Sequence, residues 1–420
     1  MKVREFGFSK LHTIKQSQNI FFSKFNSFNK IENIETEESF HRILATDIIA
    51  EKNLPGFKRA AMDGFAIIAE NSYGASETNP LQLKIIGNII AGESVDIDIE
   101  SGQAVKISTG AMVPNNATGI IKLEDCEIIN DNTLEIYLSI PPGRNIADKD
   151  EDVKIGDLIL KKYKKLKPWD ISMLISLQIY QIPVYSQPNI FILSTGDEII
   201  APQNTIQQGQ IIDSNKPALI SWLKFMGCNI SKSIICKDNM SAITQSLNSI
   251  TDDIDLIITT GGTSVGSKDF MAEIIENLGE LYVHGVAIRP GKPLALGSLN
   301  IKNNNFPIIA LPGYPLAAFI NFHLFVSPLI QNWTHQDPLL MKKTRITLGE
   351  KIPSKVGSTD FVRLIDTPDG IFLNRITGAG ILSSLVKSNY LLEIPYDLEG
   401  HNKGDIVEVY IINQPNPINY

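Results

Sequence analysis

The chain has 420 residues, of which 43% are hydrophobic and 20% are charged, and its formal net charge at pH 7 is −8. This length exceeds one ordinary hydrophobic core and predicts about two to four domains in a soluble globular protein. The acidic balance argues against a nucleic-acid partner. No apolar run reaches the roughly 18 residues of a membrane span, and the N-terminus lacks a signal peptide's apolar core.

The cysteines and histidines indicate no structural metal site. Cys126, Cys228 and Cys236 are scattered along the chain, with neither metal-ligand spacing nor a disulfide framework. The six histidines form no HxH or HExxH motif. We therefore expect buried thiols in a reducing cytoplasm and no structural zinc.

In the N-terminal third, the hydrophobic pattern predicts helices weakly and then a series of short strands. The first residues (FGFSKLHTIKQSQNIFFSKF) could form an amphipathic helix, and a second helix is expected near Glu37–Ala50. Turn signals at Pro55-Gly56 and Asp63-Gly64 then bracket a short loop. Residues 65–140 read as short β-runs separated by Pro, Gly and Asn, which predicts a small β-rich domain.

The centre of the chain has the pattern of a doubly wound α/β domain. Pro141–Asp157 is rich in Pro, Gly and charge and marks a domain boundary. Strands and helices then alternate to about residue 330, which predicts a mostly parallel sheet that binds ligands at the carboxyl ends of its strands. The expected strands are IFILST, NISKSIIC, LIITT and FPIIAL, and the expected helices are Pro217–Met226, Met240–Ile250, Phe270–Leu278 and Leu316–Leu329. Residues 336–420 return to strand-like runs and predict a small β-barrel or sandwich.

The stretch Asp255–Asp269 (DLIITTGGTSVGSKD) is the strongest local signal. It reads as a buried parallel strand, a glycine-rich turn and a helix start, a combination that lets backbone approach a phosphate. Asp269 could hold a metal that bridges phosphates, or it could simply cap the helix. On this stretch alone both interpretations are open.

Other loops of the α/β domain add polar groups at the same predicted edge. They are Ser194–Glu198 and Leu311–Pro315, which together with the glycine-rich loop describe a phosphate- or nucleotide-sized pocket. Arg289 and Lys292 flank the stiff turn Pro290-Gly291, where they could bind an oxyanion or form a solvated basic turn.

Asp63 and Thr109 are ambiguous in the same way. Asp63 could open a turn or be a held functional carboxylate, and Thr109 could be structural or face a ligand. His284 has no acidic partner at short range and reads as structural. No Ser/His/Asp or Cys/His arrangement is legible from spacing, so the chemistry indicated is the handling of anions and metals.

Taken as an ordered set, these motifs resemble the molybdopterin molybdotransferases, the MoeA family that includes the gephyrin E domain. The resemblance covers roughly residues 33–395, and the segments that carry it are MDGFA (62–66), ISTGA (107–111), STGDEI (194–199), DSN (213–215), GGTSVGSKD (261–269), AIRPGKP (287–293), LPGYP (311–315) and GAGILSSLVKSN (378–389).

This resemblance implies a multidomain α/β plus β fold in a homodimer. The implied parts are a MogA-like doubly wound central domain, a β-rich domain, an elongated two-segment domain and a C-terminal β-barrel domain. The corresponding limits are 1–54 and 146–180 (elongated domain), 55–145 (β-rich domain), 181–335 (α/β molybdopterin-binding domain) and 336–420 (β-barrel domain).

The implied activity is insertion of molybdate into adenylylated molybdopterin, with Mg²⁺ assisting and AMP released. A molybdopterin adenylyltransferase and acceptor molybdoenzymes are the implied partners, and neither nucleic acid nor membrane is expected. A dimeric scaffold of the same fold, the preceding adenylyltransferase and a generic nucleotide-binding protein are the alternatives. The β-rich segments and MDGFA argue against the last two.

The residues carried over from the family fall into three groups. The catalytic candidates are Asp63, acting across the dimer interface, with Thr109, Glu198, Asp238 and Asp269. The Mg²⁺ candidates are Asp269 and Glu198. The substrate-binding candidates are Gly261, Gly262, Ser264, Gly266, Asp213, Asn215, Arg289, Lys292, Pro312, Pro315, Arg363 and Ser383.

The chain departs from the family pattern at a few positions around these residues. Ala60 stands where Ser is usual, Ala147 where Arg is usual, and Gly285 where Lys is usual. Tyr314 replaces an Asn, and Arg289 replaces a Lys, which keeps the charge but changes its geometry. The core carboxylates are intact, so an active enzyme is expected.

Overall fold

The computed structural model describes residues 11–263, 270–335, 342–375, 378 and 380–413. By its internal contacts the chain divides into two units. Unit 1 comprises Met1–Glu32, His41–Ile43 and Tyr185–Tyr420, and unit 2 comprises Asn33–Phe40 and Leu44–Val184.

Unit 1 is built on a mixed sheet in the order β16-β13-β17-β21-β20-β18. The strands are β13 (Asn189–Thr195), β16 (Asn229–Cys236), β17 (Leu256–Thr260), β18 (Gly279–His284), β20 (Ala295–Ile301) and β21 (Asn304–Leu311). Parallel pairing joins β16, β13, β17 and β21, as the apolar runs predict, whereas β20 and β18 extend the sheet antiparallel.

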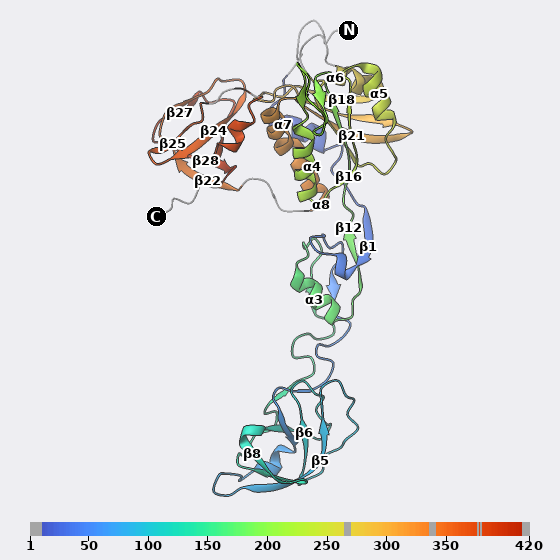
Figure 1. The fold of residues 1–420 in the computed structure, drawn as a ribbon, viewed down its shortest axis with the longest axis vertical. Helices are drawn as coiled ribbons and strands as arrows, with labels where there is room; N and C mark the ends of the chain where they lie inside the picture. The colour runs from blue at the N-terminus through green and yellow to red at the C-terminus, as the bar shows by residue number, and fades with distance from the viewer. Residues whose placement is uncertain (1–10, 264–269, 336–341, 376–377, 379, 414–420) are drawn as a thin grey trace. The chain divides into compact units, whose positions relative to one another are not determined.

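Helices cover both faces of this sheet (Figure 1). They are α4 (Asn215–Phe225), α5 (Met240–Asn248), α6 (Phe270–Leu278), α7 (Pro315–Asn321) and α8 (Ser327–Thr334), with a π-helical turn η4 (Phe322–Val326) between the last two. Phe191 and Leu193 of β13 pack with α5 and α6, while Ile190 and Ile192 pack with α4, α7 and α8. The doubly wound α/β domain predicted from the sequence is therefore confirmed.

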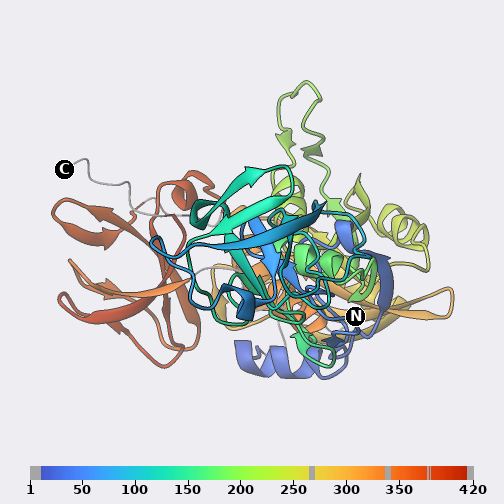
Figure 2. The same cartoon turned by 90° about the horizontal axis from the view of Figure 1, so that it is seen from below.

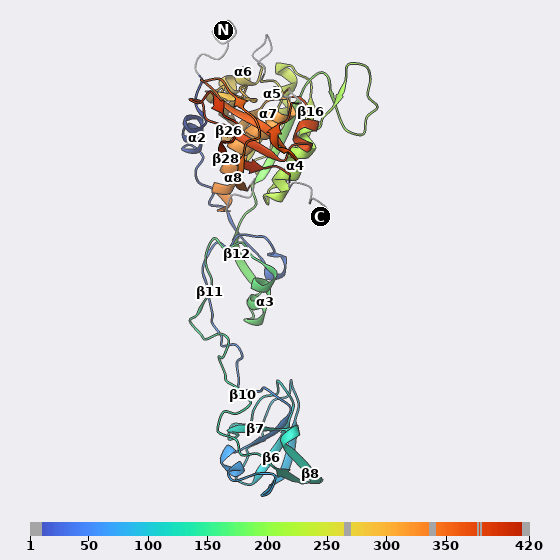
Figure 3. The same cartoon turned by 90° about the vertical axis from the view of Figure 1, so that its left-hand side faces the viewer.

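The N-terminal segment joins the core that contains Ile190 and Ile192 through helix α2 (Ile14–Phe22), the dark blue helix of unit 1 in Figure 3. Thr13 caps the helix reciprocally with Gln16, and Phe21 is fully buried. The Gln18 amide also donates to the Leu324 carbonyl at 2.7 Å. The helix expected at the start of the chain is confirmed.

The helix expected near Glu37–Ala50 is wrong. Only a 3₁₀ turn, η1 (Thr36–Glu38), and a short strand, β2 (Ile48–Ile49), form there. The N–H groups of Leu44 and Ala45 donate to the distant carbonyls of Lys164 and Pro183 instead of to their own helix. Tertiary pairing thus overrides a weak local helix propensity.

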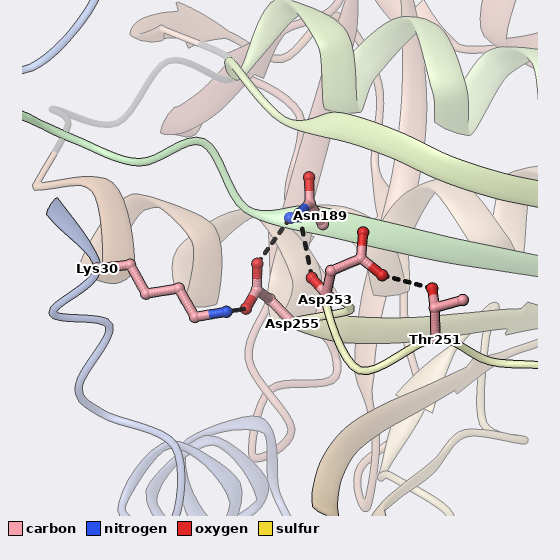
Figure 4. Close-up of polar contacts among 5 residues, drawn as sticks. All are labelled: Lys30, Asn189, Thr251, Asp253 and Asp255. Atoms are coloured by element: carbon pink, nitrogen blue, oxygen red, sulfur yellow. Dashed lines mark hydrogen bonds and ion pairs between the residues drawn. The ribbon is translucent and has the colours of Figure 1, made fainter. Parts of the chain in front are cut away.

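The amino ends of the parallel strands are tied to the N-terminal segment through Asp255 (Figure 4). Lys30 Nζ lies 2.5 Å from Asp255 Oδ1, and the Asn189 N–H donates to Asp255 Oδ2 at 2.8 Å. The Asp255 carboxylate is nearly buried, at 6% exposure, so these two donors stabilise a charge that would otherwise be costly to bury.

The C-terminal part of unit 1 is a β-rich domain, as expected. Its elements are β22 (Lys343–Thr347), β23 (Ile352–Pro353), β24 (Thr359–Thr367), β25 (Gly370–Leu373), α9 (Ser383–Val386), β26 (Tyr390–Ile394), β27 (Gly400–His401) and β28 (Ile406–Ile411). The strand β19 (Ile288–Arg289) leaves the α/β domain and pairs with β24, and Phe361 and Leu391 share a core with the α/β helices.

A short ribbon of β14 (Ile199–Ile200) and β15 (Ile211–Ile212) also projects from unit 1 (Figure 2). The residues between these two strands are largely exposed.

Unit 2 carries the predicted β-rich sheet, in the order β7-β4-β6-β5-β9-β8. Its strands are β4 (Gly64–Ile67), β5 (Leu81–Ile89), β6 (Gln103–Ile107), β7 (Gly119–Lys122), β8 (Cys126–Asn130) and β9 (Thr133–Ile136). The remaining elements are β3 (Arg59–Ala60), η2 (Ala69–Ser72), η3 (Leu123–Asp125), β10 (Ile146–Ala147), β11 (Leu158–Leu160) and α3 (Pro168–Ser176). The strands β1 (Ile31–Glu35) and β12 (Gln181–Tyr185) pair where the chain passes between the units.

His323 of the π-helical turn packs against the C-terminal sheet. Its ring meets the Tyr410 ring edge-on at 5.2 Å between centroids. Burial, and secondarily the charge of Lys343, lowers the pKa of His323 from its ordinary 6.5 to about 4. The imidazole is therefore neutral in the folded protein down to about pH 4, whereas in the unfolded chain it takes up a proton below about pH 6.5.

We expect His323 to make unit 1 sensitive to acid. Its stabilisation is complete above pH 6.5 and is lost as the pH falls toward 4, at most about 3 kcal/mol. Urea unfolding of the wild type and His323→Phe at pH 7.5 and 4.5 measures the difference, because Phe keeps the aromatic contact but cannot titrate. Equal losses of stability in the two proteins would show that His323 does not cause the acid sensitivity.

No helix within the described residues has the length and apolar content needed to cross a membrane.

Candidate active site at the carboxyl edge of the α/β sheet

The carboxyl ends of three parallel strands meet at one edge of the unit 1 sheet. The register pairs Ser194 of β13 with Thr260 of β17, and Thr260 with Leu311 of β21. Each strand is followed at once by glycine or proline: Gly196, Gly261-Gly262 and Pro312-Gly313. This edge is where doubly wound sheets bind their ligands.

A cavity of about 550 Å³ opens at this edge, within the range of small-molecule sites. It is lined by Thr195, Gly196, Glu198, Ile199, Ile211, Ile212, Asp213, Ser214, Asn215, Asp238, Gly261, Gly262, Thr263, Pro293, Pro312, Gly313, Tyr314, Pro315, Gly380 and Leu382. Eight of the residues predicted from the sequence are among them: Glu198, Asp213, Asn215, Asp238, Gly261, Gly262, Pro312 and Pro315.

The backbone at positions 261 and 262 favours glycine, and position 261 leaves no space for any side chain. Their φ angles are +93° and +68°, a region that side chains disfavour. A Cβ on Gly261 would lie 2.2 Å from the Thr195 carbonyl oxygen, and one on Gly262 would lie 3.0 Å from the Thr195 hydroxyl. The glycines therefore allow the β17 loop to lie directly against the end of β13.

Asn215 fixes two of the loops that line the cavity. It is the first residue of α4, and its side-chain amide donates to the Gly313 carbonyl at 2.7 Å and to the Thr260 hydroxyl at 3.1 Å. These two bonds join the ends of β17 and β21. Asn215 thus shapes the cavity by holding two of its loops together.

Carboxylates reach the cavity from three separate segments. Asp213 is buried, accepts the Lys216 N–H at 3.0 Å and lies 3.6 Å from the Lys216 ammonium. Asp238 follows β16, and its N–H donates to the Asp197 carboxylate at 3.2 Å. Glu198 is exposed on the β13 loop. Within the described ranges, no group of three acidic, His or Cys side chains is placed to hold a metal without substrate.

Thr195 lines the cavity as part of the predicted Ser194–Glu198 loop, although it was not among the individual site residues predicted from the sequence. Its side chain is 2% exposed, and its hydroxyl makes no hydrogen bond to any residue that the structure describes. A buried polar group without a partner is costly, and a ligand in the cavity would supply one. The available signal was its position, the last residue of a buried strand before Gly196.

The basic turn lies beside the cavity. Arg289 binds Asp360 of β24 in a bidentate ion pair, with Nε 2.6 Å from Oδ1, and the Ser354 hydroxyl donates to the same carboxylate at 2.6 Å. Arg289 and Lys292 are not among the lining residues, although Pro293 is. Gly285 has a φ of +85°, a conformation that a lysine would disfavour.

Arg363 and Ser383 belong to the C-terminal domain, near the cavity-lining Gly380 and Leu382. Arg363 Nη1 donates to the Ser384 hydroxyl at 2.5 Å, and burial lowers the pKa of Arg363. Ser383 is the first residue of α9. Neither side chain lines the cavity.

Asp63 and Thr109 form a pair in unit 2. Asp63 Oδ1 accepts the Thr109 N–H at 2.7 Å and the Thr109 hydroxyl at 3.0 Å, which lowers the pKa of the carboxyl group. Antiparallel pairing of Gly64 with Ile107 brings the two loops together. Both side chains are exposed, so the pair is a preformed anionic group on the surface of unit 2.

Three predicted site residues, Ser264, Gly266 and Asp269, lie outside the described residues. For Asp269, a metal ligand and a helix cap therefore both stay open as predictions.

The fold and the cavity define an α/β ligand-binding protein with β-rich domains, whose glycine-lined edge suits a nucleotide-sized anion. Three family models match the chain in order: the MoeA N-terminal region (domain I and II) at residues 12–177, the probable molybdopterin binding domain at 191–332 and the MoeA C-terminal region (domain IV) at 345–412.

Individual relatives match over nearly the whole chain. A molybdopterin biosynthesis protein of Methanocaldococcus jannaschii is 37% identical over 96% of this chain and 98% of its own. The molybdopterin molybdenumtransferase of Haemophilus influenzae is 30% identical, with the same coverage. The crystal structure of a molybdopterin biosynthesis MoeA protein of Pyrococcus horikoshii matches at a TM-score of 0.82, with 31% identity over 96% of this chain and all of that one.

The chain belongs to the MoeA family. The resemblance inferred from its motifs is confirmed, and membership makes it a transferase of molybdenum cofactor biosynthesis.

Proposed function

We propose that the protein inserts molybdate into adenylylated molybdopterin, with Mg²⁺-dependent release of AMP. The observation that carries this proposal is the cavity formed by Gly261, Gly262 and the carboxylates Glu198, Asp213 and Asp238. These five residues lie in the segment that matches a probable molybdopterin binding domain.

The glycine loop would receive the phosphates of the substrate. Backbone without side chains lets an anion approach N–H groups closely, and the unpartnered Thr195 hydroxyl lies next to the same two glycines. Asn215 keeps this surface in place through its bonds to the β17 and β21 ends. Binding would thus cost little loop ordering.

The donor chemistry of the cavity fits Mg²⁺. This ion takes oxygen ligands and usually completes its shell with substrate phosphates and water, using only one or two carboxylates. We propose that Glu198 holds the ion together with Asp269, which the sequence predicts as the second carboxylate ligand. Bound there, it would neutralise charge on the phosphate oxygens.

The reaction balances without an oxidant or reductant. Two Mo–S bonds form as the two thiol protons leave with one molybdate oxygen as water, and one water cleaves the phosphoanhydride to give AMP. Lys292, which adjoins the cavity-lining Pro293, is our choice for holding molybdate, with Arg363 and Ser383 as further contacts. Arg289, already paired with Asp360, would orient this basic turn.

We further propose that the protein acts as a homodimer in the cytoplasm, with Asp63 and Thr109 taking part in the reaction. The described structure has Cys126, Cys228 and Cys236 as free thiols, in line with a reducing compartment. Its substrate would come from an adenylyltransferase, and its product would pass to an apo-molybdoenzyme.

AMP release from adenylylated molybdopterin tests the proposal directly. The purified protein is expected to release AMP only when both molybdate and Mg²⁺ are present. If protein that is shown to be folded releases no AMP, the proposed enzymatic activity is overturned and a scaffold of the same fold is favoured. Release without molybdate would instead indicate a hydrolase.

A further inference from the structure

Tyr314 is an exposed aromatic side chain in an otherwise polar and aliphatic cavity. It lines the cavity, yet its side chain is 66% exposed. Gly313 precedes it and Pro315 begins α7 directly after it. The ring is therefore carried on a short, stiff turn at the helix start, with little chain entropy to lose when a ligand contacts it.

Gly380 lies close to this ring. A Cβ on Gly380 would lie 3.2 Å from Tyr314 Cδ1 and 3.5 Å from Cε1, tighter than an ordinary contact, so glycine at position 380 avoids crowding the ring. The same cavity exposes the aliphatic side chains of Ile211 and Leu382, at 55% and 46%. Apolar surface thus accompanies Tyr314 in a cavity whose glycine loop and carboxylates are polar.

A second observation points to a ligand in this cavity. The Thr195 hydroxyl is nine-tenths buried and has no hydrogen-bond partner among the described residues. A ligand with a polar group that hydrogen-bonds to the Thr195 hydroxyl and a flat apolar face that covers the Tyr314 ring would match both observations. Heteroaromatic rings bearing phosphate have this character.

We propose that Tyr314 stacks on the planar heteroaromatic ring of the ligand and sets the affinity for that ring. The inference rests on the proposed function, whose substrate contains two such rings, an adenine and a pterin. Both present a π-face to an aromatic side chain. The asparagine usual in LPGNP would offer hydrogen bonds but no such face.

Calorimetric titration with three probes separates ring contact from phosphate contact. The probes are AMP, ribose 5-phosphate, which lacks the base, and the pterin neopterin. The proteins are the wild type, Tyr314→Phe, Tyr314→Ala and the control Tyr396→Ala. Tyr396 is 50% exposed and is not a cavity residue. Circular dichroism confirms that each variant is folded.

Tyr314→Ala is expected to weaken binding of one of the two rings by roughly 5- to 100-fold, as loss of one stacked base does. Ribose 5-phosphate affinity should not change, and Tyr314→Phe and Tyr396→Ala should behave as the wild type. A loss confined to AMP identifies adenine as the stacked ring, and a loss confined to neopterin identifies the pterin.

Unchanged affinity for both rings in Tyr314→Ala would overturn the inference and leave the proposed function standing. Equal weakening of AMP and ribose 5-phosphate would also overturn it, since that pattern indicates a displaced loop. A wild-type protein that binds neither ring would overturn the proposed function together with it.

Discussion

Gly261→Ala is expected to weaken ligand binding and to lower turnover strongly. The new Cβ would lie 2.2 Å from the Thr195 carbonyl oxygen, which belongs to a buried strand and cannot yield as a flexible side chain could. The positive φ adds about 1–2 kcal/mol of strain. The loop must therefore move away from β13, and a displacement near 1 Å can reduce turnover on the order of 100-fold.

Two other glycines separate the causes of this effect. Gly209 has a φ of +87° with open space around it, so Gly209→Ala carries the backbone strain without a clash. Gly313 has an ordinary backbone conformation, and its added Cβ would meet Gly261 Cα at 3.5 Å, which is an ordinary contact. Gly313→Ala therefore introduces neither backbone strain nor a clash. AMP affinity and thermal unfolding of the three variants give the comparison. Similar behaviour of Gly261→Ala and Gly209→Ala would mean that close contact between the two loops is unimportant.

Asp63→Ala is expected to lower AMP release by at least on the order of 100-fold while unit 2 stays folded. The carboxylate is exposed, so no core contact is lost, whereas an anion held by two donors from Thr109 disappears. Molybdate- and Mg²⁺-dependent AMP release measures the effect. Asp131→Ala, at an exposed turn of the same unit, is the matched control.

Thr109→Val gives this role a second readout. The Thr109 hydroxyl contributes to the lowered pKa of Asp63, after the larger contribution of the Thr109 N–H. Removing the hydroxyl should raise that pKa and move the acid limb of the rate profile to higher pH. Wild-type turnover in Asp63→Ala, or dissociation and unfolding in place of lost chemistry, would contradict a chemical role.

The fold was most predictable where burial dictates local pattern. The runs at Asn189–Thr195 and Leu256–Thr260 are mainly apolar because both faces of the parallel sheet are covered, and α6 ends where its pattern does. The region 37–50 was not predictable, because its backbone bonds run to residues more than a hundred positions away. The antiparallel strands β18 and β20 were missed: Gly297 interrupts the apolar run of β20, and β18 is short and begins at Gly279.

The candidate site was also predictable only in part. Loops that follow parallel strands must share an edge, so Glu198, Gly261 and Pro312 could be grouped from sequence. The engagement of Arg289 by Asp360 and the unpartnered hydroxyl of Thr195 are consequences of side-chain geometry. No spacing along the chain encodes them.

The division of the chain into two units also determines which parts can fold while the ribosome is still synthesising the chain. Unit 2 is a nearly continuous stretch, Leu44–Val184, with a core of its own, so it can fold as soon as it emerges. Phe21 and Phe28 emerge earlier, but their core partners include Leu256, Ile309 and Leu391. These two buried side chains must therefore wait for partners that are made hundreds of residues later, a delay during which a chaperone has reason to bind them.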